Sequence, residues 1–248
     1  MKALILAAGR ATRLRPLAEA TPKCLLDISG KPILERQLDA LVTHGIEEVI
    51  VVTGYRREAI REFIGVASHR YPFPIRSLEN PLYATTNNLY SIWTARSEIK
   101  GLPCLIFYAD VLFHPAILRI GYPTPNTQPP TPDVCLFIDR KVAEETAKVK
   151  LEGDRVTAVS KAIAPQEAMG TFIGIAKFSE KGSRLLFEEV ERLVGKGEVG
   201  LYMTAALEGL IAKGVPVYYK AVEGLPWFDI DTPKELEKAR RAWKRLER

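Results

Sequence analysis

The chain of 248 residues is 47% hydrophobic and 26% charged, with a formal net charge of +5. This length suits one large domain with a sizeable core, and the composition is typical of a soluble globular protein. Between Lys234 and Arg248, seven basic residues face three Glu, so nearly all of the positive excess lies at this end. The rest of the chain is close to neutral, which argues against a nucleic-acid-binding face on its main body.

The three cysteines, Cys24, Cys104 and Cys135, are scattered and form no Cys-x-x-Cys pair. Such a set is typical of a reducing compartment and not of a disulfide framework or a zinc site. No apolar run approaches the ~18 residues needed to span a membrane, and the short apolar start is followed by arginines instead of a cleavage site. We therefore expect a cytoplasmic protein without a membrane span.

Buried strands alternate with amphipathic helices in the first half of the chain. The predicted strands are Ala3–Ala7, Val49–Thr53, Ile75–Leu78 and Cys104–Tyr108, and the predicted helices are Pro32–Gly45, Arg56–Ile64 and Asn87–Ile99. Short apolar strands separated by helices indicate an α/β fold, with a parallel sheet covered on both faces.

The pattern changes after Asp110. Residues Gly121–Asp133 are rich in proline, and we interpret them as a passive surface connection in preference to a lid. Shorter, more antiparallel strands are predicted at Val134–Ile138, Val149–Leu151, Val156–Val159 and Phe172–Phe178. Helices Glu180–Val194 and Tyr202–Lys213, strand Val215–Ala221 and a final helix after Thr232-Pro233 follow. The apolar stripe of the final helix is expected to pack on the core or on a second subunit, which leaves a homodimer open.

The segment from Leu4 to Leu26 is typical of phosphate binding. A buried strand leads into a small-residue turn at Ala8-Gly9, and four basic residues follow, namely Arg10, Arg13, Arg15 and Lys23. Small residues let backbone N–H groups approach an anion, and Arg and Lys neutralise its charge. The spacing fits neither a P-loop nor the dinucleotide fingerprint Gly-x-Gly-x-x-Gly.

Three aspartates are candidates for a metal site. Asp110 follows a strongly apolar strand, and Asp229 and Asp231 lie two residues apart, so both point the same way if the backbone is extended. Ligands bind at the carboxyl ends of strands in open α/β sheets, and Mg²⁺ usually takes one or two carboxylates plus substrate phosphates. Each aspartate taken alone could equally cap a helix.

The stretch from Asn80 to Ser91 combines amide and hydroxyl side chains in a loop that opens a helix. Such groups suit a base edge and a ribose, although Asn87 alone could be a plain N-cap.

The strings Leu6-Ala7-Ala8-Gly9, Thr12-Arg13-Leu14 and Pro22-Lys23-Cys24-Leu25 resemble, in order and spacing, the signature of the nucleotidyltransferases that make nucleotide-diphospho-sugars and their relatives. The stretch Asn80 to Ser91 is similar to that of the phosphocholine and 2-aminoethylphosphonate cytidylyltransferase branch. One departure is Ala11, where the family usually has a second Gly. The resemblance implies a three-layer, Rossmann-like fold with a mostly parallel central sheet and a small antiparallel acceptor-binding subregion. It also implies one domain, 1–248, with an NTP-binding half at 1–120, an acceptor-binding half at 134–231 and a C-terminal helix at 232–248.

The resemblance further implies Mg²⁺-dependent transfer of a nucleotidyl group from an NTP, with CTP favoured, to a small phosphorylated alcohol. A UTP- or dTTP-dependent sugar-1-phosphate transferase and a catalytically silent nucleotide-binding regulator remain alternatives. The implied catalytic residues are Arg13, Lys23 and Lys161, and the implied metal ligands are Asp110 with Asp229 or Asp231. The implied NTP-binding residues are Leu6, Ala7, Ala8, Gly9, Thr12, Arg13, Lys23, Asn80, Thr85, Thr86 and Asn87.

The implied acceptor-binding residues are Tyr83, Tyr90, Lys161, Tyr202 and Trp227. Aromatic rings among them suit a choline-like cation. The segment 201–205, however, lacks the carboxylate that the choline branch carries just after its aromatic pair. This departure weakens the cationic interpretation and keeps a neutral polyol or sugar phosphate open.

Overall fold

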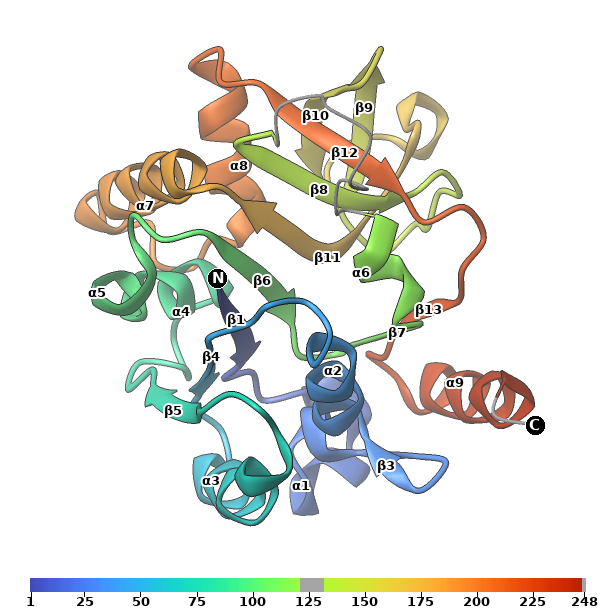
Figure 1. Ribbon diagram of the computed structural model, residues 1–248. Coiled ribbons are helices and arrows are strands. Elements are labelled where there is room, and N and C mark those ends of the chain that lie inside the picture. The colour runs from blue at the N-terminus through green and yellow to red at the C-terminus, as the bar shows by residue number, and fades with distance from the viewer. Residues whose placement is uncertain (121–131, 247–248) are drawn as a thin grey trace.

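The computed structural model describes residues 1–120 and 132–246 (Figure 1). Within these residues the main sheet has nine strands. In spatial order they are β5 (Ile75–Glu79), β4 (Glu48–Thr53), β1 (Lys2–Ala7), β6 (Cys104–Tyr108), β11 (Gly170–Phe178), β8 (Val134–Asp139), β12 (Val217–Ala221), β10 (Arg155–Ser160) and β9 (Lys148–Glu152).

The two halves of this sheet differ in strand direction. Strands β5, β4, β1 and β6 are parallel, in uninterrupted register, as their apolar sequences predict. Strand β11 joins the halves, because it runs antiparallel to both β6 and β8. Strand β9 pairs with β10 and also with β11, so the far end of the sheet folds back on itself.

Helices cover both faces of the sheet, which makes three layers (Figure 1). On one face lie α4 (Asn88–Thr94), α5 (Arg96–Ile99), α7 (Glu180–Gly195) and α8 (Met203–Ala212). On the other lie α2 (Ile33–Leu41), α3 (Arg57–Ala67) and α6 (Ala116–Ile120). The three-layer, Rossmann-like α/β prediction is therefore confirmed.

Two predicted helices differ from the structure. The first begins only at Ile33, because Pro32 belongs to a short hairpin of β2 (Asp27–Ile28) and β3 (Lys31–Pro32), and it ends at Leu41 instead of Gly45. The second is divided at Ala95 into α4 and α5. Arg96 lies 3.7 Å above the ring of Trp93 and donates to the carbonyl of that residue, which a continuing helix would use itself.

A second small sheet was not predicted. Strands β7 (Val111–Phe113) and β13 (Trp227–Asp229) pair antiparallel, with Asp229 opposite Val111. Each is shorter than the runs on which sequence patterns depend. Their pairing joins the segment after β6 to the segment before the final helix, which are far apart in the sequence, and so brings two of the candidate aspartates together.

The final helix, α9 (Pro233–Leu246), packs on the core as predicted. Its buried residues Leu236, Ala239 and Trp243 contact a cluster that includes Leu14, from the basic loop, and α1 (Leu17–Ala20) borders the same cluster. Most of the proline-rich segment 121–133 lies outside the described residues. Among the residues that are described, no helix is both long and apolar enough to cross a bilayer.

Candidate active site

Three carboxylates meet at the carboxyl end of the parallel strands. Asp110 follows β6, Asp229 ends β13 and Asp231 follows it, and ligand oxygens of all three lie within 4.8 Å of one another. The register of β7 with β13, extended by a bond from the Ile230 N–H to the Asp110 carbonyl of 3.1 Å, sets this geometry. The structure thus brings together all the aspartates that the sequence singled out.

Lys23 lies against this cluster. Its Nζ is 2.8 Å from Asp110 Oδ2 and 2.5 Å from Asp231 Oδ1, and its side chain is only 12% exposed. Burial lowers the pKa of the Lys23 ammonium, but the carboxylates of Asp110, Asp231 and Asp229 outweigh burial and hold that pKa above its ordinary value. Lys23 therefore stays charged at neutral pH.

The two later aspartates differ in protonation. Burial, reinforced by the charge of Asp110, raises the pKa of the Asp229 carboxyl to about 8. Burial also raises the pKa of Asp231. The charge and hydrogen bond of Lys23, followed by the charge of Arg13, outweigh burial and hold this pKa below its ordinary value. One of these neighbouring carboxyl groups thus resists ionisation. A bound cation would favour its ionised form and stabilise the pair.

The donor set fits a hard divalent cation. The Oδ1 atom of Asp110 is buried and has no hydrogen-bond partner among the described residues, and such an orphaned acceptor is costly unless a ligand satisfies it. The candidate ligands are all carboxylates, the donors that Mg²⁺ prefers, and the cluster includes none of the His or Cys ligands typical of zinc and copper sites.

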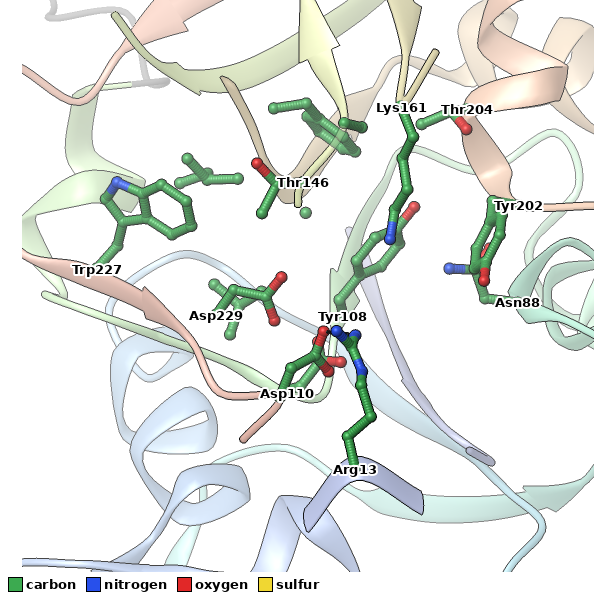
Figure 2. Close-up of a pocket in the computed structure, with 16 residues that line it drawn as sticks. Arg13, Asn88, Tyr108, Asp110, Thr146, Lys161, Tyr202, Thr204, Trp227 and Asp229 are labelled. Atoms are coloured by element: carbon green, nitrogen blue, oxygen red, sulfur yellow. Dashed lines mark hydrogen bonds and ion pairs between the residues drawn. The ribbon is translucent and has the colours of Figure 1, made fainter. Parts of the chain in front are cut away.

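Arg13 bridges the two halves of the molecule. Its guanidinium pairs with Asp231 and, at 2.9 Å, with Glu145 in the loop before β9, while about half of its side chain remains exposed. In Figure 2 it reaches from the loop after β1 toward Asp110 and the cavity above. A half-exposed guanidinium can exchange these partners for an incoming phosphate at little cost.

A cavity of about 320 Å³ lies between the basic loop and the carboxylates. Its walls include Leu6, Ala7, Gly9, Thr12, Arg13 and Lys23. At the bend of the loop, Ala11 adopts φ 48° and ψ 47°, the left-handed conformation that favours glycine. The backbone at Ala11 is thus one that would suit the glycine expected at this position.

An adjoining cavity of about 160 Å³ is lined by Ala8, Asn80, Tyr83, Thr86 and Asn87 together with Ser91. The Asn80 amide donates to Thr86 (3.1 Å) and Ser91 (3.2 Å) and accepts from the Leu82 N–H, so it mainly holds the loop in shape. Asn87 does not cap α4 with its side chain and instead donates to the Gly200 carbonyl at 3.1 Å.

A third cavity, of about 180 Å³, holds Lys161, Tyr202 and Trp227 (Figure 2). Lys161 and Trp227 enter it from opposite sides, and the Lys161 ammonium lies 5.3 Å from the centre of the Tyr202 ring. Asp110 and Tyr202 line all three cavities, which are therefore neighbouring parts of one site.

Three expected site residues lie elsewhere. Tyr83 lines the cavity of Asn80 and not that of Lys161. Tyr90 stacks on Trp93 at 4.9 Å, and neither Tyr90 nor Thr85 lines any of these three cavities. Asn88 and Ser91, three residues apart, share the face of α4 that lines a cavity, whereas Tyr90, two residues beyond Asn88, lies on another side of the helix.

Several lining residues were missed from sequence, namely Asn88, Tyr108, Thr146 and Thr204. Asn88 lies beside the identified Asn87, and Tyr108 ends the strand before Asp110, so both had a positional signal. Thr146 comes from an irregular loop and had none. Glu235, which accepts from the N–H groups of Asp231 and Thr232 at 2.8 Å each, had the signal of a capping box.

Known nucleotidyltransferases are similar to parts or all of this chain. Residues 3–120 match the MobA-like NTP transferase domain. The chain is 38% identical over 101 residues to the choline-phosphate cytidylyltransferase of Streptococcus pneumoniae, which covers 41% of the chain and 42% of that enzyme. It is 27% identical over 256 residues to the CTP:phosphoglutamine cytidylyltransferase of Campylobacter jejuni, which covers 96% of the chain and 98% of that enzyme. A third relative matches 96% of this chain. That relative is longer, and this chain spans only 38% of its length.

A solved structure with a similar fold also belongs to a nucleotide-transferring enzyme. The inositol-1-phosphate CTP transferase of T. maritima superposes with a TM-score of 0.81 at 18% identity, over 99% of this chain and 96% of that one. In sequence and in fold, the chain is thus similar to nucleotidyltransferases. Residues 3–120 of the chain match a MobA-like NTP transferase domain, and the rest of the chain lies outside that match.

Proposed function

We propose that the protein transfers a nucleotidyl group, preferentially from CTP and with Mg²⁺, to a small phosphorylated alcohol and releases pyrophosphate. The observation that carries this proposal is the meeting of a basic-loop cavity and a second cavity at the cluster of Asp110, Asp229 and Asp231. Two substrates bound in these cavities would face each other across the carboxylates. The preference for CTP is supported by relatives that are named cytidylyltransferases.

In the proposed reaction, a phosphate oxygen of the acceptor attacks the α-phosphorus of the NTP in line. The new O–P bond forms as the bond to the bridging oxygen breaks, and pyrophosphate leaves with the electron pair. A phosphate monoester with a second pKa of about 6 is already anionic at neutral pH, so the nucleophile needs no general base. Catalysis then consists of alignment and charge neutralisation.

The chain's own residues divide this work. Lys23, buried and charged, would neutralise charge that develops around the α-phosphate. Arg13 would grip the triphosphate and the leaving pyrophosphate, and Lys161 would draw the acceptor phosphate into line. Asp110, with Asp229 and Asp231, would hold Mg²⁺, which when bound supplies charge neutralisation at the phosphates.

Pyrophosphate release tests the proposal. The purified chain would be assayed with each of the four NTPs, with and without Mg²⁺, against phosphocholine, 2-aminoethylphosphonate and the phosphates of inositol, glycerol and sugars. We expect CTP to give the highest rate, and only with Mg²⁺. A preference for UTP or dTTP with a sugar 1-phosphate would instead support the pyrophosphorylase alternative.

A substitution connects this activity with the site. Lys23→Ala should lower turnover on the order of 10²- to 10³-fold, the loss typical of one preorganised electrostatic group. Lys181→Ala is the matched control, because the Lys181 side chain is 69% exposed and pairs with Asp133. Circular dichroism of both variants checks folding. Near-normal pyrophosphate release by a folded Lys23→Ala variant would contradict the role of Lys23.

A further inference from the structure

We infer that the alcohol part of the acceptor is a small, uncharged polyol and carries no ammonium group; this rests on the proposed transfer reaction. The inference concerns the cavity lined by Lys161, Tyr202 and Trp227, which we call the acceptor cavity (Figure 2). At about 180 Å³ it is smaller than the neighbouring basic-loop cavity of about 320 Å³. It therefore suits a short acceptor.

A cation of the protein already lies against Tyr202, one of the aromatic rings of this cavity that a bound ammonium could use. Alkylammonium groups are recognised within about 6 Å of an aromatic ring centre. The Nζ of Lys161 lies 5.3 Å from the centre of the Tyr202 ring. An acceptor ammonium against Tyr202 would meet the like charge of Lys161 at contact distance, which is destabilising.

No carboxylate is left over to pair with an ammonium. Among the described residues that line the acceptor cavity, the acidic ones are Asp110, Asp229 and Asp231, the three whose oxygens converge within 4.8 Å. The same lining holds the cations of Arg13 and Lys161. With a divalent cation on the carboxylates, the net charge of this lining becomes positive, which favours an acceptor whose only charge is its phosphate.

The remaining polar lining is neutral and suits hydroxyl groups. Asn88 accepts from the Met203 N–H at 2.7 Å through Oδ1, and its NH₂ group, which also interacts with the Tyr108 hydroxyl, can donate to a ligand. Thr146 donates to the Ala143 carbonyl at 3.1 Å, so its oxygen is left to accept. Thr204 adds a further hydroxyl at the start of α8, close to Tyr202. A polyol offers partners to both kinds of group.

Acceptor selectivity and acceptor binding together test this inference. The specificity constant kcat/KM would be compared between glycerol 3-phosphate and inositol 1-phosphate on one side, and phosphocholine and 2-aminoethylphosphonate on the other. Calorimetry with Mg²⁺ and a non-hydrolysable CTP analogue would measure binding of the same compounds without turnover. We expect the better of the two polyol phosphates to have a kcat/KM and a binding affinity at least about tenfold higher than either cationic compound. A tenfold difference corresponds to about 1.4 kcal/mol.

Two substitutions at one position sharpen the test. Thr204→Val keeps the shape but removes a hydroxyl, and should raise KM for the polyol phosphate roughly tenfold while kcat changes little. Thr204→Glu adds a carboxylate beside Tyr202 and should shift the ratio of specificity constants toward phosphocholine. Thr157→Val is the matched control, because Thr157 is exposed on β10 and lines none of the three cavities.

The outcomes separate this inference from the proposed reaction. If wild-type protein releases pyrophosphate but prefers and binds phosphocholine or 2-aminoethylphosphonate, the inference is overturned and the reaction stands. If no NTP and acceptor pair yields pyrophosphate, the proposed reaction is wrong. Calorimetry then still decides which acceptor class the cavity binds.

Discussion

Ala11 carries a left-handed backbone at the bend of the basic loop, with φ 48° and ψ 47°. For a residue with a Cβ, this conformation costs roughly 1–2 kcal/mol, whereas glycine adopts it freely. Ala11 and its two neighbours in the chain, Arg10 and Thr12, line the basic-loop cavity. The strain therefore lies where backbone groups are expected to meet phosphate.

Replacing this residue tests whether the strain is real. Ala11→Gly should leave the free energy of unfolding unchanged or raise it by up to about 1 kcal/mol, because relief of strain offsets the greater entropy of an unfolded glycine. Ala242→Gly, inside helix α9, is the control and should lower the same quantity by about 1 kcal/mol. Urea denaturation measures both. A loss at Ala11 equal to that at Ala242 would show that the bend is not strained.

At the scale of elements, the start of α9 positions a candidate metal ligand. Glu235 Oε2 accepts from the Asp231 N–H and the Thr232 N–H at 2.8 Å each, and the Glu235 N–H donates to Thr232 Oγ1 at 3.3 Å. This reciprocal cap fixes the backbone that carries Asp231. Glu235 is thus a positioning residue for the carboxylate cluster.

Removing this cap should loosen Asp231 without touching substrate. Glu235→Ala should raise the Mg²⁺ concentration for half-maximal pyrophosphate release about tenfold. Glu235→Gln should keep this concentration near the wild-type value, because an amide oxygen accepts the same hydrogen bonds. Glu237→Ala, which removes only the exposed pair of Glu237 with Arg240, is the control. A Mg²⁺ dependence unchanged in Glu235→Ala would assign Glu235 to helix stability alone.

A buried ion pair connects helices α7 and α8. The Glu189 side chain has no exposed surface, and its oxygens lie 2.5 Å from Arg192 and 2.6 Å from Lys213, just beyond α8. Hydrogen bonds from Arg192, and then from Lys213, lower the pKa of Glu189 to about 2 against the opposing effect of burial. Gly209 of α8 makes room for this carboxylate, since a Cβ there would collide with it.

The lowered pKa makes stability depend on pH in one direction. A carboxylate whose folded pKa lies below its unfolded value stabilises the protein above pH 4.5 and ceases to do so as the pH falls toward 2. Glu189→Gln should therefore cost roughly 1–3 kcal/mol of unfolding free energy at pH 7, and the difference from wild type should shrink at pH 3. Glu188→Gln, on the exposed side of α7, is the control. A difference independent of pH would mean that packing and not charge explains the loss.

At the scale of the whole molecule, the long apolar strands and the motifs after β1 could be predicted because each depends on local sequence. Cys104–Tyr108 is identical in prediction and structure, and the positions of the three aspartates at strand ends predict the cluster that they form. The pairing of β7 with β13, two three-residue strands, could not be predicted because only distant segments in contact stabilise it. The same is true of Thr146 and Glu145, which an irregular loop brings to the site.

Strand β11 pairs along one side with β6 and along the other with β8 and β9. The matched domain, residues 3–120, contains β6 but not β11. Separated from the remainder, β6 would present a row of free backbone N–H and C=O groups on an apolar strand, and such an open edge templates aggregation. The second half therefore closes the edge of the first, and this pairing should keep the strands of residues 3–120 from self-association.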